Sequence, residues 1–246
     1  MTTLVGAEFL KLRTTRGWIG YVLALVVLTG IGTAAQVGSA AEVDLGTPEF
    51  QRDLVAGSLA SLIAFLVGIT SVTVEWRHGT ITRTLLVTPR RELHVAAKGI
   101  AAFLAGVALA VLAVAVVLAV AIPFIVARDA SFVLDSGLGA RVGRIVLAAA
   151  LWGALGAGVG SLLKSQTFAL VAGILWILLF EALLTLLLGL VDLDSAADFL
   201  PAQALGAFEG SVDDALSPVA GGVVGLAYVV GVSLLGWFRV EHSDVT

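Results

Sequence analysis

The chain has 246 residues, of which 59% are hydrophobic and only 13% are charged, and its mean hydropathy is +1.05. Soluble domains carry about 25% charged residues, so this composition excludes a water-soluble fold. The formal net charge is −4, and the lack of cysteine excludes disulfides and thiolate chemistry. The three histidines, His78, His94 and His242, are scattered and form no HExxH pair, so no metal site is predicted.

Six stretches are apolar over the roughly 20 residues that a helix needs to cross a bilayer. They occupy residues 17–37, 55–74, 99–126, 142–163, 166–191 and 218–238. Basic residues precede the first stretch, as in a signal peptide, but its apolar run is longer than such peptides carry. We therefore expect an all-α integral membrane protein with six transmembrane helices, in which residues 1–246 form a single transmembrane domain.

The basic residues predict the orientation of these spans. If the N-terminus is cytoplasmic, ten of the 14 Lys and Arg residues fall in cytoplasmic segments and four fall outside. The longest outer segment, residues 192–217, holds six acids and no Lys or Arg. We expect a multi-pass protein of the cell membrane with both termini in the cytoplasm.

Residues 75–98 form the longest cytoplasmic connection, between the second and third spans. Thr80 can cap a short helix, on which Ile81 and Leu85 lie on one face. Pro89 ends that helix and can begin the next one. The pattern predicts a short helix lying across two span ends. The simpler interpretation is a surface loop whose arginines follow the positive-inside rule.

The order of residues in this connection resembles the cytoplasmic loop of ABC-2 type transporter permeases. The resemblance rests on Glu75, Arg77, Gly79, Thr80, Leu85, Leu86, Pro89, Arg91 and Lys98. The opening segment, residues 8–13, is similar to the family's interfacial segment, and Val5, Phe9 and Leu12 there share one helical face. The six-span layout and Leu200-Pro201 before the last span also look like the family.

The resemblance implies the membrane-spanning permease of an ATP-driven exporter. Two copies of a separate ATP-binding subunit, and a second permease copy or paralogue, would complete it within membrane lipid. The implied coupling residues are Glu75, Arg77, Gly79, Thr80, Ile81, Leu85, Leu86, Pro89 and Arg91.

ATP and Mg²⁺ would bind the partner, so we expect neither an enzyme nor a cofactor in this chain, and no nucleic acid. The nearest approach to a phosphate loop, residues 158–165, has Leu163 where a P-loop needs glycine.

Glu181 lies within the fifth apolar stretch, where a carboxylate costs about 2.5–3.5 kcal/mol on insertion scales. It should therefore be shielded from lipid. Either it lines a translocation path or a subunit interface, or it is a hydrogen-bonded acid that orients its helix. Arg141 and Arg144, which begin the fourth span on the outer side, should pair with acids such as Asp135 or Asp192, or else contact lipid headgroups or an anionic substrate.

The Gly156/Gly160 and Gly221/Gly225 spacings favour close helix packing within the chain. Two other functions remain open. One is a membrane sensor or immunity protein that acts without an ATPase. The other is an intramembrane enzyme using Glu181, although no other predicted span contains a second acid or a histidine to assist it.

Overall fold

The computed structural model describes residues 5–8, 10–11, 17–56, 59–80, 91–212 and 216–242, apart from the side chain of Arg91. These residues form helices, turns and bends, with no strand among them. Six helical segments are long and apolar enough to cross a membrane. The prediction of an all-α, multi-pass membrane protein is therefore confirmed.

The membrane-length segments are α2 (Gly17–Ser39), α4 with α5 (Pro48–Ala56 and Ala60–Arg77), α7 (Arg91–Val126), α8 (Ser136–Leu163), α9 to α10 (Gln166–Gly189) and α13 (Pro218–Glu241). The described residues also form the short helices α3 (Glu42–Leu45), α11 (Asp194–Ala197) and α12 (Pro201–Glu209), and residues 5–8 and 10–11 of the N-terminal segment are helical as well.

Several helices extend beyond the predicted apolar runs because their terminal turns are polar. α7 begins eight residues before the predicted span, and its first turns carry Glu92, His94 and Lys98. α8 begins six residues early, at Ser136, because the Asp135 carboxylate accepts the Leu138 N–H (2.7 Å) and caps the helix. Hydropathy alone does not detect such turns.

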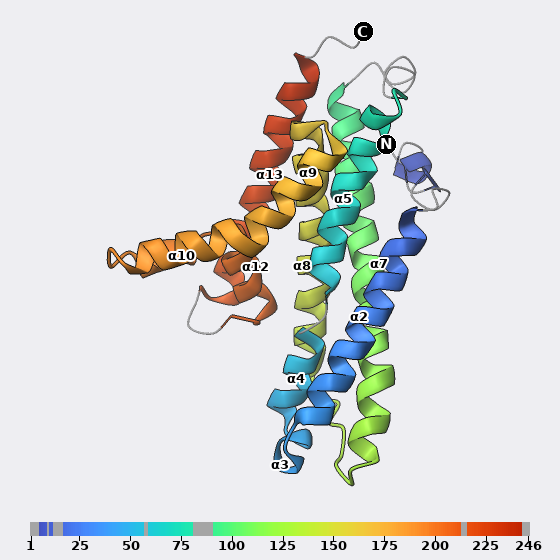
Figure 1. Cartoon of the computed structure of the whole chain (residues 1–246), viewed down its shortest axis with the longest axis vertical. Coiled ribbons are helices and arrows are strands. Elements are labelled where there is room, and N and C mark those ends of the chain that lie inside the picture. Colours follow the sequence, from blue (N-terminus) through green and yellow to red (C-terminus); the bar gives the residue numbers. More distant parts are fainter. Residues whose placement is uncertain are drawn as a thin grey trace.

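α8 lies at the centre of the bundle, with α5, α7 and α13 packed around it (Figure 1). Glycines permit this close packing. A Cβ at Gly68 would collide with the Gly153 carbonyl, and a Cβ at Gly156 would collide with the Phe65 carbonyl. A Cβ at Gly221 would meet the backbone of α12. Both predicted glycine pairs therefore lie at helix contacts within the chain.

The fifth membrane-length segment is interrupted, where the sequence predicted one span over 166–191. α9 (Gln166–Leu175) passes through a π-helical turn, η1 (Trp176–Phe180), into α10 (Glu181–Gly189). Figure 1 shows α10 leaving the bundle sideways, with α12 beneath it. A π turn inserts one extra residue into the helix and bends it. This accounts for the kink between α9 and α10, where there is no proline.

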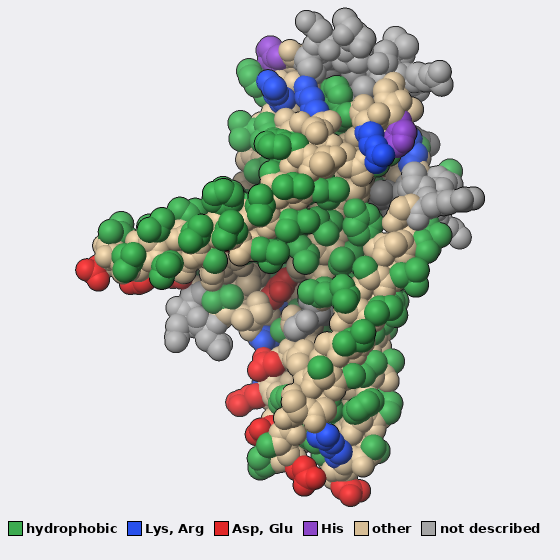
Figure 2. Space-filling view, in the orientation of Figure 1, with side chains coloured by type: hydrophobic (Ala, Val, Ile, Leu, Met, Phe, Trp, Pro, Cys, Tyr) green, Lys and Arg blue, Asp and Glu red, His purple; other side chains and the backbone are tan. Residues whose placement is uncertain are grey.

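The two ends of the bundle differ in charge. Figure 2 shows Lys and Arg gathered mainly at the end formed by the last turns of α5 and α13, which we call the basic end. Asp and Glu lie mostly toward the opposite, acidic end and at the tip of α10. Arg128 is a basic residue that belongs to the acidic end. It donates to the carbonyls of Val37 (3.1 Å) and Gly38 (3.0 Å), where the α2 dipole is negative.

Candidate functional site

The C-terminal end of α5 closes with a Schellman motif. The Gly79 N–H donates to the Trp76 carbonyl (3.3 Å), and the Thr80 N–H donates to the Glu75 carbonyl (3.0 Å). Gly79 has a φ of +65°, a left-handed conformation that glycine adopts without strain. This motif ends α5 at Gly79 and Thr80, and it fixes the last turn of the helix, which carries Glu75.

Four charged side chains from three parts of the chain meet beside this turn. Lys98 of α7 is buried, donates from Nζ to Glu8 Oε2 (2.7 Å), and lies 3.0 Å from Glu75 Oε1. Lys11 Nζ donates to Glu8 Oε1 (2.6 Å) and to Glu75 Oε1 (2.9 Å). Opposite charges thus alternate, and together they attach the N-terminal segment to α5 and α7.

The imidazole of His94 lies beside these four charged groups, and we call the five residues Glu8, Lys11, Glu75, His94 and Lys98 the charged cluster. Its Nε2 atom lies 3.6 Å from Glu75 Oε2, which is too far for a hydrogen bond. Both atoms are buried, and neither has a hydrogen-bond partner among the described residues. A small rearrangement of the cluster would therefore allow these two atoms to pair.

The lysines keep Glu8 ionised. Burial would raise the pKa of its carboxyl group, but Lys98 and Lys11 together outweigh burial and hold the pKa below 4.5. Burial would lower the pKa of the Lys11 ammonium group, but its hydrogen bonds and ion pairs with Glu8 and Glu75 raise the pKa above 10.5. Glu8 and Lys11 are therefore both charged at neutral pH.

The cluster holds three parts of the chain together by ion pairs. Removing one partner from a buried ion pair leaves an uncompensated charge, which costs about 3–5 kcal/mol. The cluster therefore links the positions of the N-terminal segment, the end of α5 and the start of α7. Among the described residues, no group of three or more His, Asp and Glu side chains could hold a metal ion.

The other predicted coupling residues fall into two groups. Ile81, Leu85, Leu86 and Pro89 lie outside the described residues, as does the helix that Thr80 would cap. Arg77 ends α5 and donates from Nη1 to Gln166 Oε1 (3.2 Å), which links α5 to α9.

Arg91 is the first residue of α7. The structure therefore places Glu75 in the charged cluster and the Arg77 side chain against α9. It also brings Glu8, Lys11, His94 and Lys98 together with Glu75, a grouping that the sequence did not predict.

Glu181 is buried, so the prediction that it is shielded from lipid is confirmed. It follows the π turn as the first residue of α10. Its Oε1 accepts the Trp176 indole N–H (2.7 Å), and its Oε2 accepts the Ala202 backbone N–H (2.8 Å) in the first turn of α12. Glu181 therefore joins the bend in the fifth segment to the N-terminus of α12, where a carboxylate is favourable.

A second buried carboxyl group, Glu209, was not singled out from the sequence. The Ser61 hydroxyl donates to Glu209 and joins α12 to the start of α5. Burial raises the pKa of Glu209 to about 7, although Ser61 and the nearby Arg141 both act to lower it. No local pattern marks this residue, because its partner Ser61 lies 148 positions away.

Arg141 pairs with an acid, as predicted, but with neither of the two candidates, Asp135 and Asp192. Its Nη2 lies 3.0 Å from Asp53 Oδ1 on α4. Asp135 instead caps α8 and pairs with Arg52, so its oxygens are already engaged. Arg144 has no carboxylate within 4.0 Å among the described residues, so its contact with lipid headgroups or an anion stays a prediction.

No protein-family model matches this chain, and no curated protein matches it. The comparisons therefore show no family for this chain.

Proposed function

We propose that this chain is the membrane-spanning permease subunit of an ABC-2 type ABC transporter, acting as an exporter in the cell membrane. Two copies of a separate ATP-binding subunit would drive it, and a second permease copy or paralogue would complete the assembly. Hydrolysis of ATP would take place on the partner subunits.

The observation that carries this proposal is the charged cluster. Residues 81–90 lie between the end of α5 and the start of α7, which Glu75 and Lys98 join through a 3.0 Å ion pair. A force applied to this short connection would reach both spans together, since neither end can move without disturbing a buried ion network. Glu8 and Lys11 extend the same joint to the N-terminal segment.

The charge distribution supports a cytoplasmic position for this end of the bundle. Lys98, Lys164 and Arg239 all belong to the basic end, where Lys164 Nζ donates to the Arg239 carbonyl (2.9 Å). Basic residues favour the cytoplasmic side of a membrane protein. Both termini and the loop would then face the cytoplasm, where an ATP-binding subunit resides.

The test is co-purification in mild detergent with two matched variants. Leu85→Asp introduces a charge at the proposed contact, and burying that charge unpaired would weaken docking by about 3 kcal/mol or more, over 100-fold in Kd. Leu134→Asp makes the same change at an exposed position of the acidic end. We expect wild type and Leu134→Asp to retain an ATP-binding subunit and stimulate its hydrolysis, and Leu85→Asp to lose it.

A different result would favour another function. If wild-type protein co-purifies with no ATP-binding subunit, the chain is better explained as a membrane sensor or immunity protein. If Leu85→Asp retains the subunit and normal stimulated hydrolysis, the loop is a basic surface turn and does not couple the two proteins.

A further inference from the structure

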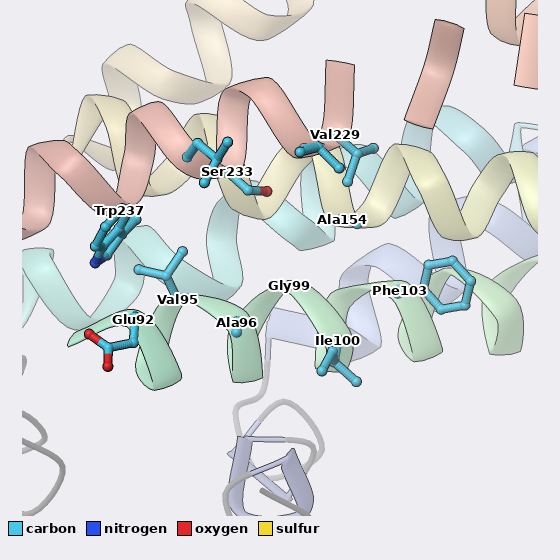
Figure 3. A pocket seen from close by; sticks show the side chains of 12 residues that line it. Glu92, Val95, Ala96, Gly99, Ile100, Phe103, Ala154, Val229, Ser233 and Trp237 are labelled. Carbon is cyan, nitrogen blue, oxygen red and sulfur yellow. The ribbon is translucent and has the colours of Figure 1, made fainter. Parts of the chain in front are cut away.

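A long apolar groove runs between α7 and α13, with α8 at its base (Figure 3). Its volume is about 700 Å³. Its wall is almost entirely hydrocarbon, including Ile100 and Phe103 from α7 and Val230 and Leu234 from α13. Apolar cavities of this kind stay dry and bind apolar molecules, so water is not the expected occupant.

The groove is as long as one leaflet is thick. It extends along α7 from Glu92 to Phe103, which at 1.5 Å per residue is about 16 Å. Half of a bilayer's hydrocarbon core is about 15 Å. The match suits a single hydrocarbon chain that enters from one leaflet and ends near the bilayer centre.

The groove opens to the side on which lipid would lie. Ile100 is 42% exposed and Leu234 is 55% exposed, although both line the groove, so the wall continues onto the outer surface of two membrane-length helices. A lipid chain could therefore enter laterally, without passing through the bundle.

The charged group of the groove lies at one end, while Ser233 lies nearer the middle, between Trp237 and Val229 (Figure 3). Figure 3 shows Glu92 and Trp237 at the opposite end from Phe103, and this end of α7 belongs to the basic end of the bundle. The Trp237 indole N–H is buried and has no acceptor among the described residues. Tryptophan is typical of the membrane–water interface, where a lipid offers phosphate and ester oxygens as acceptors.

We propose that this groove binds one acyl chain of a phospholipid with a primary ammonium headgroup, such as phosphatidylethanolamine. The chain lies against Ile100 and Leu234, an ester or phosphate oxygen accepts the Trp237 N–H, and the ammonium group pairs with Glu92. The exposed carboxylate favours a zwitterionic headgroup that carries an ammonium group over an anionic headgroup that carries none. This inference does not depend on coupling to an ATPase.

The test measures binding of defined phospholipids to delipidated protein in detergent, by native mass spectrometry. Gly99 lines the groove, and a Cβ there would meet no atom within 4 Å, so we expect the ring introduced by Gly99→Phe to occupy the groove. Gly20→Phe adds the same ring at an equally open position on α2. We expect Gly99→Phe to weaken binding of phosphatidylethanolamine by about tenfold or more, and Gly20→Phe to leave it unchanged.

A Glu92→Gln variant tests whether Glu92 recognises the headgroup. Glu92 is exposed, so Glu92→Gln leaves the fold intact and should remove the preference for phosphatidylethanolamine over phosphatidylglycerol. Equal binding by wild type and Gly99→Phe would overturn the proposal. So would a wild-type preference for phosphatidylglycerol, or delipidated protein that pairs with a second copy through the groove.

Discussion

Replacing Lys98 with methionine should detach the N-terminal segment from the bundle. Methionine fills a similar volume but removes the ammonium group that lies 2.7 Å from Glu8 and 3.0 Å from Glu75. Both glutamates are buried, and Lys11 alone would then face two carboxylates. The loss of one partner from such a network costs about 3–5 kcal/mol.

The chain can avoid most of this cost by releasing Glu8 and Lys11 into water. Local opening is therefore expected in place of global unfolding. Hydrogen exchange at the amides of residues 5–11, measured by mass spectrometry, should accelerate about 100-fold or more for an opening that is 3 kcal/mol easier. Amides in the middle of α8 should keep their protection.

Arg239→Met is the matched control, because it removes a positive charge from an exposed position at the same end. Its exchange at residues 5–11 should equal that of wild type. The reasoning is refuted if Lys98→Met also exchanges like wild type, since the cluster would then not hold the segment. A Glu8→Gln/Lys98→Met double variant should cost less than the sum of the single changes, by about 1–3 kcal/mol.

Three further predictions concern the acids and the helix contacts. Because the pKa of Glu209 is raised from 4.5 to about 7 in the folded protein, the free energy of unfolding should fall by about 3 kcal/mol as the pH rises from about 4.5 to about 7. The Glu209→Gln variant should lose this pH dependence when unfolding is measured in detergent, and a variant that keeps it would disprove the prediction. Glu181→Leu leaves the Trp176 and Ala202 N–H donors without an acceptor, at about 1–3 kcal/mol each, whereas Glu181→Gln keeps one acceptor, so the melting temperature of Glu181→Gln should lie between those of Glu181→Leu and wild type. Equal melting temperatures for all three proteins would show that Glu181 does not hold α10 to α12. Gly156→Val should lower the free energy of unfolding by about 1–3 kcal/mol or more in a denaturant titration, whereas Gly20→Val, where a Cβ meets no atom, should leave it unchanged. Similar unfolding free energies for the two variants would contradict the close packing of α8 on α5.

The apolar runs predict all six membrane-length segments, because length and hydropathy are local properties of the sequence. They do not predict the kink at Trp176–Phe180, which contains neither proline nor glycine. That bend is accompanied by tertiary contacts, namely Glu181 bonded to Trp176 and to the N-terminus of α12. The short helices α11 and α12 were likewise missed, since short helices between polar turns carry little hydropathy signal.

The loop sequence pointed to Glu75 and Lys98 separately, and the opening segment pointed to Glu8. Their meeting could not be predicted, because Glu8 and Lys98 are 90 positions apart and contact depends on how the segment folds back. The sequence also did not predict which acids pair with basic residues on other helices. Arg141 bonds Asp53 because α4 lies beside α8, whereas the nearer acid in sequence, Asp135, is used by the first turn of its own helix.

Crosslinking from the loop tests the central claim most directly. The chain has no cysteine, so a photocrosslinker can be attached to a Thr88→Cys variant, or to a Ser211→Cys variant as a control, with no other site on this chain. In native membranes we expect the Thr88→Cys protein to crosslink to an ATP-binding subunit from the cytoplasmic side, and the Ser211→Cys protein to be labelled only from the other side. No ATP-binding subunit at Thr88→Cys, or labelling of both variants from one side, would contradict the account.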